Sequence, residues 1–387
     1  MSPLRELTVE RIAFRLLEAP AESAVQMSFG SITMRRAFLV EVTAQGVTGV
    51  GETWVNHPDW GWRERVATLE DGIAPLMLGM ALSHPSQAHV RLAEKLVGIG
   101  RQWNALGPIY QAISGVDMAL WDLFAKLEQV PVSRLLRAEA TGAEGAAGVP
   151  FYASGVGPTD VRALCEEAMS LGANAVKAKV GFGEERDRAT LRSIRDVCGD
   201  GIGLFMDANR AWNAEDSTTA RRLAEDFGVE WIEEPLADAA PAALRDFSIR
   251  SGRPVALGEN LYGPDGFTPF LGLSGIAELQ PDVAKCGGLT VAWDVVTRAE
   301  AARASVSPHW YGAATGLAAS LALATASGSV RWMEMDMRAN PLRTELYENP
   351  YVLEGGLVRR DEAVGLNGPI RSQTVEKFQT YCKEFTR

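Results

Sequence analysis

Seven ionisable residues between residues 179 and 334 each lie at the end of a short apolar run. They are Lys179, Asp207, Glu233, Glu259, Asp282, His309 and Glu334. Successive members are 23–28 residues apart, which suits one strand followed by one helix. The carboxyl ends of parallel strands meet at one face of a barrel, so we expect these side chains to converge on one site.

The carboxylates Asp207, Glu233 and Glu259 come from three consecutive runs. Carboxylates crowded together repel one another and cannot all stay ionised without a cation. An all-oxygen set favours Mg²⁺ or Mn²⁺ over zinc. An ion pair with a neighbouring lysine is the alternative role for Glu233. Glu234 follows it directly, and because adjacent strand residues point to opposite faces, we expect only Glu233 to face the centre.

Two lysines two residues apart, Lys177 and Lys179, share one face of their strand. Neighbouring ammonium groups lower each other's pKa, which would make one of them a base near neutral pH. A pair of inter-strand ion pairs is the alternative.

A carboxylate and an imidazole, Asp282 and His309, come from adjacent runs. A carboxylate bonded to one ring nitrogen fixes the tautomer and raises the basicity of the other nitrogen, which suits an acid/base pair. The remaining histidines, His57, His84 and His89, are interpreted as satisfied core or surface groups, although the loop position of His57 also makes it a candidate substrate contact.

The runs that carry these residues alternate with amphipathic helical stretches from residue 149 to residue 334. The eight runs are Val149–Ala153, Ala175–Val180, Ile202–Asp207, Val229–Glu233, Val255–Glu259, Ile276–Asp282, Val306–His309 and Trp332–Glu334. This alternation predicts an α/β fold in which a parallel sheet under helices closes into a (β/α)8-type barrel.

The N-terminal part of the chain predicts a small α+β unit. Ala37–Thr43 and Val47–Gly51 read as a hairpin, and helices are expected near Arg63–Met77, Pro85–Gly98 and Pro108–Glu128. Two segments are interpreted as long functional loops: Ala19–Thr33, and Trp54–Trp62 with its three tryptophans. Trp103 and Tyr110 are expected to be buried.

Composition narrows the class of protein. The 387 residues carry a net charge of −11, which disfavours nucleic acid and anionic membranes as partners. The N-terminus lacks the apolar core of a signal peptide, and no apolar stretch approaches the ~20 residues of a membrane span, so we expect a cytoplasmic protein. The four cysteines (Cys165, Cys198, Cys286 and Cys382) are scattered and suit a reducing compartment.

The segments VKAKVG, MDANRAW, WIEEPL, LGEN, QPDVAKCGG, SPHW and WMEMD resemble, in the same order, those of the enolase superfamily, in particular its mandelate racemase subgroup. The resemblance implies a modified TIM barrel, (β/α)7β, over residues 131–345. It also implies an N-terminal α+β capping domain over 1–130 and a C-terminal segment, 346–387, that packs on the cap. A homo-oligomer, from dimer to octamer, is implied as well.

The same resemblance implies roles for the site residues. Lys179 would be the base, with Lys177 near the substrate carboxylate. Asp207, Glu233 and Glu259 would hold one Mg²⁺ per subunit, with Mn²⁺ possible in its place. His309 and Asp282 would form a second acid/base pair, and Glu334 would stabilise the enolate oxygen. Muconate-lactonising relatives carry a lysine where Asp282 stands, so that subgroup is disfavoured. Lys285, common to both subgroups, is given no acid/base role.

The expected reaction is metal-dependent abstraction of the proton α to a carboxylate through an enediolate. Dehydration of a sugar acid or related hydroxy acid to a 2-keto-3-deoxy acid is favoured on the resemblance; racemisation or epimerisation is the alternative. A non-catalytic metal- or ligand-binding barrel is disfavoured because it would not need both acid/base groups. Contacts to this small carboxylate substrate are expected from Asn209, Arg210, His57 and Trp54. The tryptophan-rich loop Trp54–Trp62 suits a lid that excludes water, or a smaller or cyclic substrate.

Overall fold

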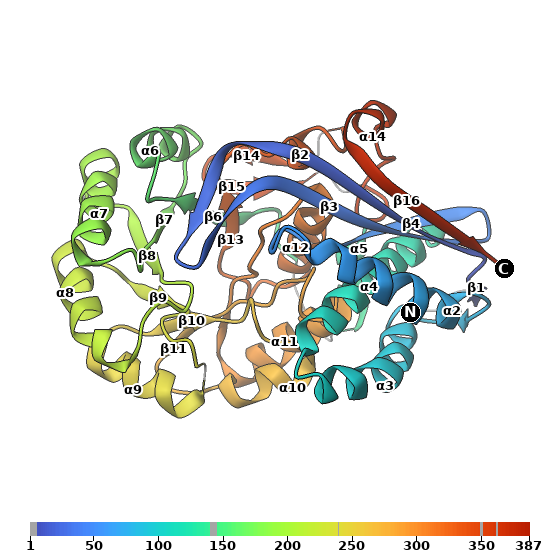
Figure 1. Cartoon of the computed structure of the whole chain (residues 1–387), viewed down its shortest axis with the longest axis horizontal. Coiled ribbons are helices and arrows are strands. Elements are labelled where there is room, and N and C mark those ends of the chain that lie inside the picture. The colour runs from blue at the N-terminus through green and yellow to red at the C-terminus, as the bar shows by residue number, and fades with distance from the viewer. Residues whose placement is uncertain (1–5, 140–144, 239, 349–350, 361–362) are drawn as a thin grey trace.

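A computed structural model describes residues 6–139, 145–238, 240–348, 351–360 and 363–387. An antiparallel sheet with strand order β16-β2-β3-β4 forms the cap, from β2 (Arg11–Met27), β3 (Gly30–Ala44), β4 (Val47–Thr53) and β16 (Gln379–Thr386). The predicted hairpin is thus confirmed as β3 and β4, which pair from Phe38↔Thr53 to Ala44↔Val47. The C-terminal strand β16 pairs with β2 along the sheet's edge (Figure 1).

The segment Ala19–Thr33 is not a loop, as the sequence suggested, but the far end of a long β-hairpin. Strands β2 and β3 stay paired as far as Pro20↔Met34, shift register between Pro20 and Val25, and pair again from Val25↔Ile32 to Met27↔Gly30. Figure 1 shows this hairpin reaching from the cap along the barrel. The polar and proline-containing sequence hid the strand because only its later residues alternate as strand residues do.

The cap helices pack on one face of this sheet. They are α1 (Gly61–Ala67), α2 (Ala74–Met77), α3 (Ser86–Gln102) and α4 (Leu106–Leu127), with a π-helical turn at Thr68–Ile73. Glycines let α4 approach β4, since a Cβ added at Gly51 would lie 2.0 Å from the carbonyl oxygen of Gly115. Tyr110 is buried as expected, but the prediction for Trp103 is wrong: this side chain is 67% exposed at the end of α3.

Eight parallel strands form the barrel: β6 (Val149–Val156), β7 (Ala175–Lys179), β8 (Gly203–Asp207), β9 (Trp231–Glu233), β10 (Val255–Leu257), β11 (Ile276–Leu279), β12 (Ser305–Val306) and β13 (Met333–Asp336). Each falls within or overlaps one predicted run. Strands β6 to β12 are neighbours in sequence order, and β13 returns to pair with β6.

Helices follow the first seven strands and surround them: α6 (Val161–Ser170), α7 (Glu184–Cys198), α8 (Ser217–Phe227), α9 (Pro241–Ser251), α10 (Gly263–Phe267), α11 (Leu289–Ala302) and α12 (Ala314–Ala326). The fold is therefore α/β, a modified (β/α)7β TIM barrel with a cap. Short elements complete it: β1 (Leu7–Thr8), β5 (Ala81–Leu82), α5 (Val132–Glu139), α13 (Pro341–Thr344), β14 (Val352–Glu354), β15 (Leu357–Arg359) and α14 (Ser372–Phe378). The predicted domain boundaries at residues 130 and 345 stay predictions.

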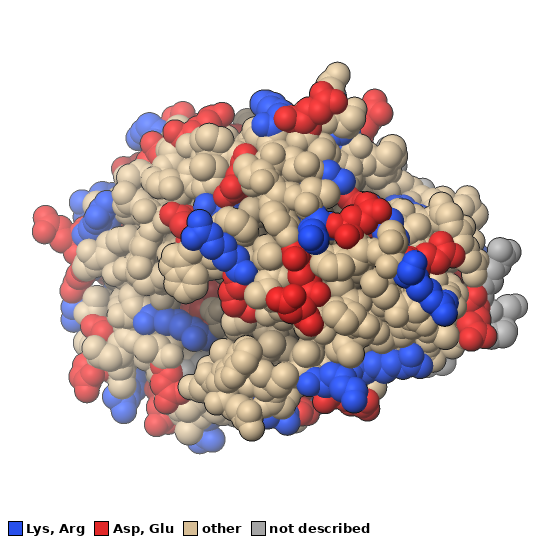
Figure 2. Space-filling model, turned by 45° about the vertical axis from the view of Figure 1, so that its right-hand side comes forward, with Lys and Arg blue, Asp and Glu red and all other residues tan. Residues whose placement is uncertain are grey.

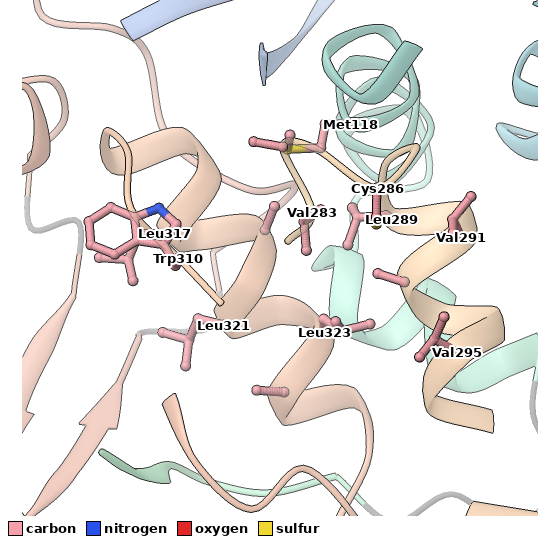
Figure 3. Packing of buried hydrophobic residues seen from close by; sticks show 14 of the residues in the cluster. Met118, Val283, Cys286, Leu289, Val291, Val295, Trp310, Leu317, Leu321 and Leu323 are labelled. Atoms are coloured by element: carbon pink, nitrogen blue, oxygen red, sulfur yellow. The ribbon is translucent and has the colours of Figure 1, made fainter. Parts of the chain in front are cut away.

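Apolar residues join the cap to the barrel. Met118 of α4 lies close to Val283 and Cys286, beside the apolar sides of α11 and α12 (Figure 3). Helix α12 is buried nearly all round, and a helix apolar on every side belongs inside a protein.

Aromatic side chains fill the barrel below the strand ends. The rings of Phe205 and Trp231 stack with centroids 4.1 Å apart, and Tyr152 meets both edge-on. This aromatic floor confines any ligand to the upper mouth of the barrel.

Basic and acidic side chains alternate over the face shown in Figure 2, where no broad basic patch is seen. Among the described residues, no helix has the length and hydropathy to cross a membrane.

Candidate active site

Strand register places three of the predicted site residues in one row. In the parallel pairs, Lys179 of β7 lies opposite Asp207 of β8, and Asp207 lies opposite Glu233 of β9. Residues paired in this way point to the same face of a sheet. The expectation that strand ends would bring these side chains together is met.

Lys177 lies at the centre of a buried ion cluster. Its Nζ lies 2.8 Å from both carboxylate oxygens of Glu233 and 2.7 Å from Oε1 of Glu334, and all three side chains are at most 2% exposed. Gln280 also donates to Glu233, at 2.6 Å. The alternative role of Glu233, an ion pair with a neighbouring lysine, is therefore present in the structure.

Neighbouring charges shift the pKa values of the two glutamates of this cluster in opposite directions. Burial alone raises the pKa of Glu334, but Lys177 and His309 lower it to about 2. For Glu233, burial together with Asp207 and Glu334 outweighs Lys177 and raises the pKa to about 8. A carboxylate in such acidic surroundings is one that a divalent cation would stabilise.

Lys179 forms an ion pair with Asp207 and donates to Oδ1 of Asn209 at 3.0 Å. Burial and Lys177 lower the pKa of Lys179, but Asp207 and other carboxylates raise it by a larger amount, so the net shift is upward. Lys177 thus lowers this pKa as predicted, but the expected net lowering is wrong for the structure, because the nearest charge is the Asp207 carboxylate. A cation held by Asp207 would weaken that contact.

His309 and Asp282 form the predicted pair. Nδ1 of His309 lies 2.6 Å from Oδ2 of Asp282, whose Oδ1 accepts the backbone N–H of Ala284 at 2.8 Å. Nε2 of His309 lies 2.7 Å from Oε2 of Glu259. Burial lowers the pKa of His309, but Glu259, Glu334 and Asp282 raise it well above its usual value.

Glu234 also reaches the site, contrary to the expectation that only one glutamate of the pair would. Its φ of 37° takes it out of the strand conformation, and its carboxylate accepts from Arg210 at 3.2 Å and from Asn260 at 3.0 Å. Asn209 and Arg210 also have positive φ, at 44° and 63°. Such backbone conformations in non-glycine residues gather at functional sites.

A cavity of about 480 Å³ opens above these residues. Lys179, Glu259, His309 and Glu334 reach its wall, and so do all four predicted substrate contacts, Asn209, Arg210, His57 and Trp54. Side chains of the long hairpin line the opposite part: Val25, Met27, Phe29 and Ile32.

Sequence reasoning missed several residues of this wall. Lys285 lies over the Trp54 ring, 4.7 Å from its centroid, and donates to Oδ1 of Asn260 at 3.1 Å. Tyr262 and Tyr311 line the same cavity. Lys285 had a signal, its place three residues after Asp282 in a tight turn. The hairpin residues had the length of the segment Ala19–Thr33, which was interpreted as functional, but no signal for the individual side chains.

The three predicted metal ligands fit a divalent cation by type. All are carboxylates, which suit Mg²⁺, and two are register partners on adjacent strands. Within the described ranges, no group of three or more His, Cys, Asp or Glu side chains is arranged as a metal-binding cluster. Instead each carboxylate contacts its own cation: Lys179 for Asp207, Lys177 for Glu233 and His309 for Glu259. A cation would therefore stabilise these three carboxylates.

Comparison with known families agrees with this geometry. Residues 11–137 match the model described as "Mandelate racemase / muconate lactonizing enzyme, N-terminal domain", and residues 160–371 match "Enolase C-terminal domain-like". The chain belongs to the enolase superfamily, in its mandelate racemase subgroup. It is thus an enzyme of this superfamily, as the sequence motifs predicted.

The curated relatives of this superfamily member differ in their reactions. D-galactarolactone cycloisomerase from Agrobacterium fabrum is 30% identical over 69% of the chain and 74% of the relative. Arabinonate dehydratase from Saccharolobus solfataricus is 26% identical over 88% of the chain and 89% of the relative.

Solved structures share the whole architecture. A putative mandelate racemase from Bordetella bronchiseptica superposes with a TM-score of 0.87 at 28% identity, covering 97% of this chain and 95% of the other. Structures of the same fold include proteins with bound magnesium. The relatives are dehydratases, cycloisomerases and racemases, which leaves the specific reaction to the site.

Proposed function

We propose that this enzyme removes the proton α to the carboxylate of a 2,3-dihydroxy acid and expels the β-hydroxyl group as water. The enol that remains then tautomerises to a 2-keto-3-deoxy acid. The observation that carries the proposal is the pair of acid/base groups on one cavity, Lys179 on β7 and the His309–Asp282 pair beyond the ends of β12 and β11. One base and one acid are what such an elimination requires.

The proposed roles follow from the contacts of each residue. Lys179 would take the α-proton, and a cation held by Asp207 would compete with Lys179 for that carboxylate. His309, protonated on Nε2, gives a proton to the β-hydroxyl so that water leaves. Asp282 keeps the ring oriented through Nδ1. Lys177, which contacts Glu334, would stabilise the substrate carboxylate, and Glu334 would stabilise the enolate oxygen.

Asp207, Glu233 and Glu259 would hold one Mg²⁺, or Mn²⁺, which would supply positive charge against the carboxylate of the intermediate. Burial of the site below the cap would keep bulk water from the enediolate. Asn209, Arg210, His57 and Trp54 would contact the rest of the substrate. Racemisation remains the second candidate, because two groups that both carry protons can also return the α-proton from the other side.

A library of linear and cyclic sugar acids, incubated with Mg²⁺ in deuterated water, tests the reaction. We expect semicarbazide-reactive keto acid from at least one member, and loss of turnover in K179A and H309N. Recovery of only α-deuterated acid or its epimer would replace dehydration by racemisation. Turnover that survives exhaustive chelation would contradict the metal assignment, and full activity of either variant would remove that residue's role.

A further inference from the structure

The cap segment that leaves β4 runs directly along the two loops that carry the acid/base pair. Glu52 lies in β4, and Trp54 and Asn56 follow the end of that strand. Glu52, Trp54 and Asn56 all point at the barrel loops, as their hydrogen bonds show.

The first of these loops carries His309. Trp54 Nε1 donates to the Tyr311 carbonyl at 3.1 Å, and Asn56 Nδ2 donates to the same oxygen at 3.3 Å. The Glu52 carboxylate accepts the backbone N–H groups of Ala313 and Gly316, both at 2.8 Å. These N–H groups belong to the first turn of α12, where a helix has donors without partners inside the helix. A carboxylate of the capping domain therefore caps the N-terminus of a barrel helix, four residues after His309.

The second loop carries Asp282. The backbone N–H of Trp54 donates to the Ala284 carbonyl at 3.3 Å, and the Ala284 N–H donates to Oδ1 of Asp282 at 2.8 Å. Trp54 therefore bonds to both loops, through its backbone on one side and its indole on the other. The Asp282–His309 hydrogen bond spans these same two loops.

The approach of Glu52 depends on small residues. A Cβ added at Gly312 would lie 2.7 Å from Oε1 of Glu52, so glycine is needed there. Glu52 is 2% exposed and is not part of the cavity wall, so it acts on the site only through the loop that it holds. In the part of the chain that the structure describes, no hydrogen bond links residues 52–56 to the strand end that carries Lys179.

We propose that Glu52 and Trp54 are positioning residues through which the cap sets the Asp282–His309 pair against Lys179. The proposal rests on the proposed function for its kinetic consequence but not for its geometry. The cap then does more than enclose substrate: it aligns the acid side of the reaction and leaves the base side to the barrel. A displacement of about 1 Å at a reacting group can cost about 100-fold in rate.

The test compares E52Q with D117N in the full-length protein. Gln has one acceptor oxygen where Glu52 uses two, so E52Q breaks one of the bonds to the start of α12. Asp117 is the matched control, because it is also a buried cap carboxylate and accepts from Thr290 at the start of α11, at 2.9 Å. W54F, which keeps an aromatic ring but loses the indole N–H, is the second variant.

The first readout needs no substrate. In ¹⁵N-histidine-labelled protein, H309N identifies the Nδ1–H signal of His309 among the four histidines. We expect this signal to shift or broaden in E52Q and W54F and to stay in place in D117N. An unchanged signal in folded E52Q and W54F would overturn the proposal, whatever reaction the enzyme catalyses.

The second readout uses whichever acid the library identifies. In E52Q, α-deuterium exchange through Lys179 is expected to stay within about 3-fold of wild type while keto acid formation falls about 10- to 100-fold, as for a displaced acid. D117N should keep the wild-type ratio of the two rates. Equal loss of both rates in E52Q and D117N would show a merely structural role and refute the proposal.

Discussion

Replacing Lys177 by methionine tests the central ion cluster most directly. Lys177 is the cation shared by Glu233 and Glu334, at 2.7–2.8 Å, and all three are buried. Methionine keeps most of the apolar length but leaves two carboxylates facing each other without a cation. Removing one partner of a buried ion pair typically costs about 3–5 kcal/mol.

The magnitude can be measured by urea unfolding at pH 8, followed by tryptophan fluorescence. A slope of about 3 kcal/mol per M urea converts that loss to a midpoint shift of at least about 1 M. The direction with pH also follows. Lys177 and His309 together lower the pKa of Glu334 to about 2. The charged pair therefore stabilises the fold above the unfolded pKa of glutamate and loses that contribution as the pH falls toward 2.

The double variant K177M/E334Q provides the control. Removing the second charge should restore part of the loss, because only one buried carboxylate then lacks a partner. A loss below about 1 kcal/mol in K177M would match an exposed ion pair rather than a buried one. That result, or an equal loss in the double variant, would refute the account of the cluster.

Three further predictions follow from the fold and the site. Burial raises the pKa of Asp117 to about 7, although the N–H groups that bond to it lower this pKa. The contribution of Asp117 to stability is therefore complete below pH 4 and is lost as the pH rises through 7. The stability of D117N relative to wild type should rise over this range by on the order of 4 kcal/mol, measured by urea unfolding at several pH values. Mg²⁺ should raise the unfolding midpoint of wild type and of E234Q but much less that of E233Q, and the reverse order would make Glu234 the ligand. In G51A the new methyl would meet the Gly115 carbonyl, so thermal unfolding should show a loss of about 1–3 kcal/mol or more, and an unchanged melting temperature would contradict the close packing of α4 on β4.

Spacing was enough to locate the barrel and its functional face. Each apolar run between residues 149 and 334 contains or overlaps a strand, because a buried parallel strand must be short, apolar and followed by a helix. The ionisable residue at each run's end then had to reach the same mouth. The long β2–β3 hairpin could not be predicted in this way, since pairing with a neighbour, rather than its own pattern, makes Pro20 to Met27 a strand.

The residue types that meet at the barrel mouth could thus be predicted from the sequence, because they repeat once per strand and helix. Their partners could not. That Lys177 bonds to Glu233 and Glu334, that Glu234 turns into the cavity on a positive φ, and that Glu52 holds the start of α12 all depend on distances between residues 24 to 264 positions apart. The local sequence pattern predicts which face of its own strand a side chain takes. Which charged residue that side chain contacts is decided only when the barrel closes and the cap packs against it.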